Sequence, residues 1–289
     1  MNRKKGLHRD VPLAEYHALD AYGSSDLRAM RAGPPALVPW RKKNPSLQTD
    51  ATRLGTAAHC AIIEPAAFEA RFAHKPDGMK FSTKDGIAWR DDPARAGMEI
   101  LTHDEWEQVG AIVHAFNCKP TALESLQRAT GREVTAIWQD PDTGLWLKAR
   151  PDWFDGEFVT DLKVTRWASS GAAAFRSWAE GWMHQVVHYR AGLAECGVHV
   201  KGCRLVLVHP EPPQVSRVVC VQLKEDAAGL LHLENERTVQ AMAACVASGV
   251  WPGEVDEWQK IDLPAVASAS IGVDWGDESV EPLTAARRR

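Results

Sequence analysis

The sequence predicts an α/β fold in which helices flank a mixed central β-sheet. The order of the elements is the first observation. Helical patterns fill the N-terminal half, and three strand-like segments, a helix, two further strands and a long helix follow. Composition is the second observation, because 45% hydrophobic and 25% charged residues over 289 positions are ordinary for a globular chain. A chain of this length buries a core large enough to fold without a disulfide or a metal.

Helices are expected through most of the N-terminal half. Ser24 or Ser25 is a candidate N-cap for a short helix over 26–32, which Gly33-Pro34-Pro35 ends. Residues 74–98 are rich in Pro, Gly, Asp and Lys and are expected to form a mobile excursion. Apolar residues at helical spacing predict further helices over 52–72, from 102 or 104 to about 117, and over 120–129.

Strand patterns begin after this region. Three segments are expected to form an antiparallel meander, and turn sequences separate them at Asp140–Gly144 and at Asp155-Gly156. These segments are residues 133–139, 145–150 and 157–165. A mainly helical stretch, two more strands and a long helix that Gly249 ends are expected over 171–196, 203–209, 217–223 and 224–248. We expect one domain over 1–265 and a flexible, polar tail over 266–289.

Charge, cysteine content and hydropathy exclude several classes of protein. A formal net charge of −4 argues against a globally basic nucleic-acid coat protein, although six basic residues stand against one acid over 28–53. The six cysteines form no CxxC pair, which argues against zinc ribbons and favours free thiols in a reducing compartment. No apolar run approaches the ~20 residues of a membrane helix. We therefore expect a cytoplasmic protein without a membrane partner.

Two short segments contain the candidate catalytic residues: Lys148-Ala-Arg-Pro-Asp152 and Thr160-Asp161-Leu162-Lys163. Asp161 and Lys163 share one face of a predicted strand, and the turn at 155–156 folds Asp152 back beside Asp161. Carboxylate oxygens are the ligands that Mg²⁺ and Mn²⁺ prefer, and a nearby lysine can orient water or stabilise charge on a phosphate. Taken alone, such a triplet is more often a surface salt-bridge hairpin.

Three further features accompany this triplet. His59 lies on an otherwise apolar helix face, Gln185 and Tyr189 lie one helical turn apart, and Glu133 opens the strand before the hairpin. Each alone fits a structural role, such as that of a core histidine. The chain also holds 12 tryptophans, most of which are expected in the core rather than in base-stacking positions.

Taken in order, these features resemble the PD-(D/E)xK nuclease superfamily, with Asp in the second acidic position. The most similar branch is the exodeoxyribonuclease VIII type of phage and prophage recombination nuclease. Its N-terminal pattern resembles Tyr16-His17, Ser24–Arg28 and Gly33-Pro34-Pro35. Leu54–His59 with Ile63-Glu64-Pro65, and Trp251-Pro252-Gly253, are also similar to that branch. The resemblance covers about residues 11–265 and implies a nuclease core.

The resemblance implies a role for each site residue. The metal ligands would be the side chains of His59, Asp152 and Asp161 and the carbonyl of Leu162. Lys163 would be the catalytic lysine, and Glu133 matches an acidic residue of the preceding strand. Contacts with DNA would come from Gln185 and Tyr189 on the backbone and from Arg28 and Arg31 on a terminal phosphate.

The resemblance also implies an activity and partners. It predicts an Mg²⁺ (or Mn²⁺)-dependent 5′→3′ exonuclease that acts on double-stranded DNA ends in phage-type recombination. A homo-oligomeric ring and a single-strand annealing protein as partner are expected with it. An endonuclease or a nuclease of opposite polarity on the same core is the alternative among enzymes. A non-catalytic DNA-binding or assembly module is the alternative outside them, and the complete set of Asp152, Asp161 and Lys163 argues against it.

Overall fold

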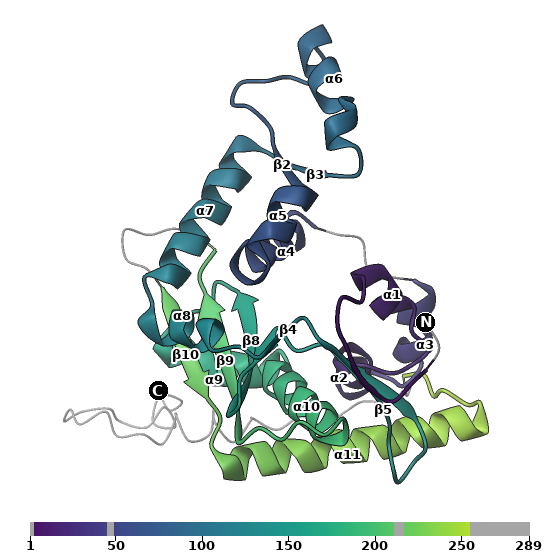
Figure 1. Ribbon diagram of the computed structural model, residues 1–289. Coiled ribbons are helices and arrows are strands. Elements are labelled where there is room, and N and C mark those ends of the chain that lie inside the picture. The colour runs from purple at the N-terminus through teal and green to yellow at the C-terminus, as the bar shows by residue number, and fades with distance from the viewer. Residues whose placement is uncertain (1–2, 45–48, 211–216, 255–289) are drawn as a thin grey trace, which may run out of the picture. The chain divides into compact units, whose positions relative to one another are not determined.

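A mixed sheet of five strands lies at the centre of the fold (Figure 1). The strands lie in the order β10-β9-β8-β7-β4; β8 and β9 run parallel and the other neighbours antiparallel. This computed structural model describes residues 3–44, 49–210 and 217–254. The predicted α/β class, a mixed sheet with flanking helices, is confirmed. The strand bounds are Gly131–Arg132 (β4), Trp153–Phe154 (β7), Phe158–Val164 (β8), Gly202–Val208 (β9) and Val218–Gln222 (β10).

A second sheet has the order β1-β5-β6 and comprises Gly6–His8, Thr135–Gln139 and Trp146–Ala149. Strands β5 and β6 pair antiparallel across the predicted turn. The predicted three-stranded meander is wrong, because β8 pairs with β7 and β9 rather than with β6. Pro151 explains the break, since proline has no N–H to donate to a ladder. The chain therefore crosses from one sheet to the other just before Asp152.

The N-terminal helices follow the predictions with one correction. The helix predicted over 52–72 is two helices that meet at Glu64. Pro65 disfavours helical backbone at the residue before it, and Glu64 has φ −131° and ψ 63°. The bounds are Leu13–Ala18 (α1), Ser24–Ala32 (α2), Leu37–Lys43 (α3), Asp50–Ile63 (α4), Pro65–Arg71 (α5), His103–Asn117 (α7) and Pro120–Gln127 (α8).

The excursion expected over 74–98 leaves the fold between two paired strands. Strands β2, Phe72–His74, and β3, Glu99–Leu101, run parallel at its base. Between them lie the helix α6, Lys84–Arg90, and a 3₁₀ turn over Pro93–Arg95. Figure 1 shows α6 beyond the end of α7, on the side away from the five-stranded sheet.

Three helices complete the described part of the chain: α9 over Ser170–Ala179, α10 over Trp182–Glu195 and α11 over Glu225–Ser248. Gly249, with φ 69°, ends α11 in the left-handed conformation that favours glycine. No helix in the described ranges is long and apolar enough to cross a membrane. The predicted end of the domain at 265 and the tail over 266–289 lie outside the described residues.

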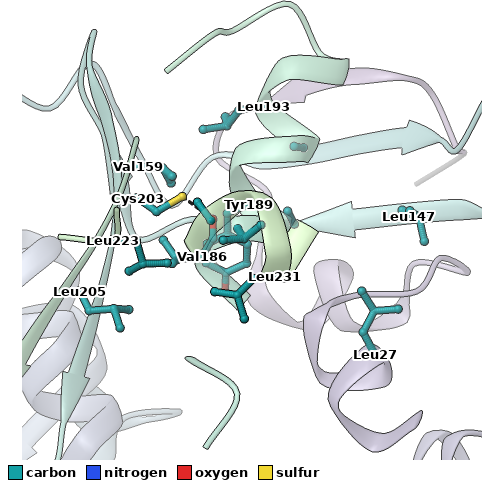
Figure 2. Packing of buried hydrophobic residues seen from close by; sticks show 14 of the residues in the cluster. Leu27, Leu147, Val159, Val186, Tyr189, Leu193, Cys203, Leu205, Leu223 and Leu231 are labelled. Atoms are coloured by element: carbon teal, nitrogen blue, oxygen red, sulfur yellow. Dashed lines mark hydrogen bonds between the residues drawn. The ribbon is translucent and has the colours of Figure 1, made fainter. Parts of the chain in front are cut away.

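Helix α10 lies against both sheets and carries much of the first hydrophobic core (Figure 2). Val186, Tyr189 and Leu193 are buried there, together with Leu205 of β9 and Leu231 of α11. A second core lies on α4 and α7, against Leu162 of β8 among others. Because side chains alternate along a strand, the face of β8 opposite to Leu162 carries Asp161 and Lys163. The sheet therefore presents these two charges on its α10 side.

Candidate metal centre

His59, Glu133 and Asp152 converge at the point where the chain crosses between the sheets. One ligand atom from each lies within 4.8 Å of the others. The Nε2 atom of His59 is 3.1 Å from Asp152 Oδ1 and 3.7 Å from Glu133 Oε1. An imidazole with two carboxylates is a donor set that suits a divalent metal. The arrangement joins α4 to residues that flank β4 and β7.

His59 reaches this group from the edge of α4. Its neighbours Ala57, Ala58 and Ile62 are buried in the second core, whereas the His59 side chain keeps 29% of its surface exposed. Burial lowers the pKa of His59, but Asp152 and Glu133 outweigh that effect and raise it to about 9. The imidazole is therefore protonated at neutral pH and must lose that proton before it can act as a ligand.

Glu133 is held in a strained backbone conformation. Its φ of 49° lies in the left-handed region, which is costly for a residue with a side chain. The Glu133 N–H donates to the Asp152 carbonyl at 3.0 Å, and Oε2 accepts from Arg150 Nε at 2.5 Å. The other oxygen, Oε1, is buried without a hydrogen-bond partner. A buried acceptor of this kind, next to an imidazole and a carboxylate, is suited to a cation.

Burial and nearby charges shift the pKa values of the two carboxylates of this group in opposite directions. Burial and the charge of Asp152 raise the pKa of Glu133 to about 7, against the opposing effects of His59 and Arg150. Burial also favours protonation of Asp152, but His59 and the Leu162 N–H lower its pKa. The Leu162 N–H donates to Asp152 Oδ2 at 2.5 Å, which ties the start of β7 to β8. Asp152 thus remains charged beside the protonated imidazole.

Asp161 and Lys163 form a pair next to the group rather than within it. Lys163 Nζ is 2.8 Å from Asp161 Oδ2 and donates to Oδ1 at 3.1 Å. Asp161 is fully buried, and burial raises its pKa while Lys163 opposes that rise. Burial lowers the pKa of Lys163, but Asp161 and Asp152 outweigh it and raise the pKa overall. Lys163 is therefore a charged ammonium at neutral pH.

A cleft of about 610 Å³ opens over these residues. His59, Glu133, Leu162 and Lys163 line it. Other walls come from α1, α4, α5 and α10, through Leu13, Gly55, Thr56, Arg71 and Trp182. The cleft is large enough for a phosphodiester group to approach the charged side chains.

Gln185 and Tyr189 lie on one face of α10, as their spacing predicts. The Gln185 side-chain N–H donates to the Tyr189 hydroxyl. Tyr189 is buried in the core (Figure 2), and burial and the charges of Asp161 and Asp152 raise its pKa. Because the tyrosine is only 5% exposed, a contact from this pair to an external ligand falls to Gln185, and Tyr189 fixes the position of the amide.

Arg28 and Arg31, one helical turn apart on α2, have different partners. Arg28 is about half exposed and forms an ion pair with Glu180 at 2.8 Å, where α9 ends. Arg31 donates to Asn235 Oδ1 of α11 at 2.8 Å, and burial lowers its pKa. Of the two arginines, Arg28 is the more exposed.

The geometry adds Arg150 and Trp182 to the residues expected from sequence. Arg150 Nη1 donates to the Val11 carbonyl at 2.7 Å while its Nε holds Glu133, so it joins the N-terminal segment to the site. Its position midway between Lys148 and Asp152 on one strand face was the signal that could have found it. Trp182 lines the cleft at the start of α10, and no sequence pattern marked it.

Comparisons with known proteins bear on the fold. No model of a protein family matches this sequence, and no curated protein matches it. A solved chain from Eubacterium rectale, named "Putative exonuclease", superposes with a TM-score of 0.53 over 92% of this chain and 100% of that chain, at 13% identity. LHK-Exo in complex with dAMP gives a TM-score of 0.29 over 66% of this chain and 89% of that chain, at 12% identity, which does not establish a shared fold. The first of these chains therefore shares the fold of this protein.

Proposed function

We propose that this protein is a metal-dependent deoxyribonuclease that acts as a 5′→3′ exonuclease on double-stranded DNA ends. The observation that carries the proposal is the group of His59, Glu133 and Asp152, in which Glu133 Oε1 accepts no hydrogen bond, beside the ion pair of Asp161 and Lys163. A fold shared with a chain named as an exonuclease supports it. The ordered sequence resemblance to PD-(D/E)xK nucleases supports it independently.

The residues present fit a bound Mg²⁺ or Mn²⁺. Two or three carboxylates and one imidazole offer hard oxygen ligands and a borderline nitrogen ligand, and Glu133 Oε1 lacks any other partner. His59, Asp152, Asp161 and the Leu162 carbonyl are the ligands that the resemblance implies, and the geometry adds Glu133. When bound, the metal would supply Lewis acidity and lower the pKa of an attacking water.

The side chains of the protein have separate tasks in this scheme. His59 would lose its proton in order to hold the metal, and Arg150 holds Glu133 in place through its Nε–H. Lys163, already charged, orients the water and stabilises negative charge on the scissile phosphate rather than removing a proton. Gln185, held by Tyr189, donates to a phosphate of the DNA backbone.

The finer assignments rest on the sequence resemblance. They are the 5′→3′ polarity, a role in phage-type recombination, a homo-oligomeric ring and a single-strand annealing partner. In that scheme Arg28 leaves Glu180 and grips the 5′ phosphate by charge-assisted hydrogen bonds. An endonuclease or a nuclease of opposite polarity on the same core is the alternative among enzymes, and a non-catalytic DNA-binding module is the alternative from another class.

Magnesium-dependent digestion of labelled duplexes tests the proposal. The full-length protein should release nucleotides from linear but not from covalently closed circular duplex, and EDTA should stop the release. A label in the 5′-terminal nucleotide should be released before a label in the 3′-terminal nucleotide. Its release should be slower when the 5′ end carries a hydroxyl instead of a phosphate. Nicking of the circle would favour the endonuclease, and early loss of a 3′ label would reverse the polarity. DNA binding without any cleavage would favour the alternative of a non-catalytic DNA-binding module.

A further inference from the structure

Three large aromatic side chains are exposed on the connection between β8 and α10. Trp167, Phe175 and Trp178 keep 41%, 43% and 51% of their surface accessible. Trp138 and Trp153, in contrast, are among the largest fully buried side chains, as expected of core tryptophans, whereas Trp40 is 58% exposed. Large apolar side chains exposed on one short connection, two of them with their rings 6.3 Å apart, are typical of a binding surface.

The chemistry of this connection suits a polyanion with flat bases. From 164 to 179 the sequence holds two arginines and no acidic residue. The Arg176 guanidinium lies 3.8 Å from the centre of the Trp167 ring, and the Phe175 and Trp178 rings lie 6.3 Å apart at 42°. Aromatic faces with nearby arginines are the combination with which proteins bind single-stranded nucleic acid, because each base offers a face for stacking.

The connection also begins and ends at the candidate site. Trp167 stands four residues after Lys163 of β8, and Trp178 stands four residues before Trp182, which lines the cleft. Four residues span at most about 14 Å. At the junction with α10, Glu180 holds Arg28, and the Arg28 side chain lies against Gly181. An aromatic surface this close to the cleft lies within reach of a DNA strand whose phosphate occupies it.

We propose that Trp167, Phe175 and Trp178 form a stacking platform for the unpaired bases of single-stranded DNA next to the cleft. The proposal rests on the proposed function, and it assigns this surface to the strand rather than to a second copy of the chain. Stacking on the platform would hold bases apart from their complement near the scissile phosphate. A duplex end, which offers few unpaired bases, would gain less from it.

Binding to a fluorescein-labelled oligothymidylate tests the platform without requiring cleavage. The full-length protein is titrated in EDTA, where a metal-dependent nuclease does not cut, and fluorescence anisotropy gives the Kd. Trp178→Ala and Trp178→Leu should each weaken binding about 5- to 150-fold, the range for loss of one stacked base. Trp178→Phe should restore binding to within about threefold, because an aromatic face remains. Leu230→Ala, at a residue 65% exposed on α11, is the control for loss of an exposed apolar side chain and should leave the Kd unchanged.

Two results would overturn the platform. One is an unchanged Kd when Phe175→Ala and Trp178→Ala are combined in a protein that melts like the wild type. The other is light scattering that shows a smaller assembly for Trp178→Ala while the Kd per chain stays the same, which would assign the surface to a copy–copy interface. The proposed nuclease activity fails separately: a wild type that binds through Trp178 but does not cut refutes the activity and leaves the platform in place.

Discussion

Two histidines bond to opposite ends of the segment Lys148–Asp152, and their surroundings shift their pKa values in opposite directions. His59 faces the carboxylates of Asp152 and Glu133, and although burial lowers its pKa they raise it to about 9. His188 is buried on α10, where its Nε2–H donates to the Lys148 carbonyl at 3.0 Å. Burial lowers the pKa of His188 to about 4.

These opposite pKa shifts distinguish a histidine that is suited to bind a metal from a histidine that packs in the core. The Lys148 carbonyl satisfies one ring nitrogen of His188, and burial keeps the imidazole neutral although that hydrogen bond opposes the fall in pKa. Two carboxylates within reach of one nitrogen instead stabilise a positive charge there, and a divalent cation can replace the proton. Substitutions in the His59 region should therefore change activity, and substitutions around His188 should change stability.

Asp152→Asn should have the largest effect on activity. The amide oxygen can still accept from the Leu162 N–H, so the fold is expected to persist, but the charge that His59 and a metal require is gone. Cleavage of linear duplex should fall on the order of 10³-fold or more. Rates of nucleotide release at saturating Mg²⁺, together with the melting temperature, measure both effects.

A second carboxylate–histidine pair supplies the control for this variant. Glu234 lies 2.6 Å from His184 Nε2 between α11 and α10, and neither residue lines the cleft. Glu234→Gln should leave the cleavage rate within about twofold of the wild type, as expected for a surface change. Near-normal cleavage by Asp152→Asn would remove Asp152 from the site.

Lys163→Ala is the next largest expected change. Because the ammonium acts on charge that develops in the transition state, kcat should fall about 10²–10³-fold while DNA and metal binding change little. Single-turnover cleavage and anisotropy with the same duplex separate the two quantities. A loss confined to DNA affinity would make Lys163 a phosphate contact and would contradict its catalytic role.

His59→Gln should change the metal requirement rather than the chemical step. The Mg²⁺ or Mn²⁺ concentration for half-maximal cleavage should rise at least about tenfold, since one ligand is lost, and excess metal should recover part of the rate. Titration of cleavage against each metal gives this value. A less stable protein with an unchanged metal requirement would show that His59 is a core histidine after all.

Local sequence patterns were sufficient for many of the elements. Thr102 and Glu105 form the reciprocal cap that begins α7, and Gly249 ends α11. Pairing between strands was harder to predict, because the partner of a strand depends on distant residues. The sequence placed β6 beside β8, but Pro151 and the short β7 move the chain into another sheet.

The candidate site was predictable where spacing alone decides geometry. Asp161 and Lys163 share a strand face through the two-residue period, and they form an ion pair. The position of Glu133 was only weakly indicated, because its φ of 49° and its bond to Arg150 depend on contacts across the fold. Nor could helical spacing reveal that Tyr189 is buried, since that depends on how α10 packs.

The core histidine, His188, should contribute to the pH dependence of stability. Its substitution should have the smallest effect on activity of the variants considered. Its folded pKa of about 4 lies below its ordinary value of 6.5, so the unfolded chain binds more protons between these values. Stability from His188 is therefore fully present above about pH 6.5 and is lost as the pH falls through about 4. The fall in pKa corresponds to about 3 kcal/mol of unfolding free energy.

His188→Gln removes this titration while keeping an N–H that can donate to the Lys148 carbonyl. The wild type should lose about 3 kcal/mol more stability than the variant between pH 7 and pH 4, because the variant has no imidazole to protonate on unfolding. Urea denaturation of both proteins across this range measures the difference directly, and the acids near His59 contribute equally to both. At pH 7.5 the variant should cleave linear duplex at close to the wild-type rate, since His188 does not line the cleft. Parallel stability curves for the two proteins, or a loss of cleavage as large as that of His59→Gln, would remove the contrast between the two histidines.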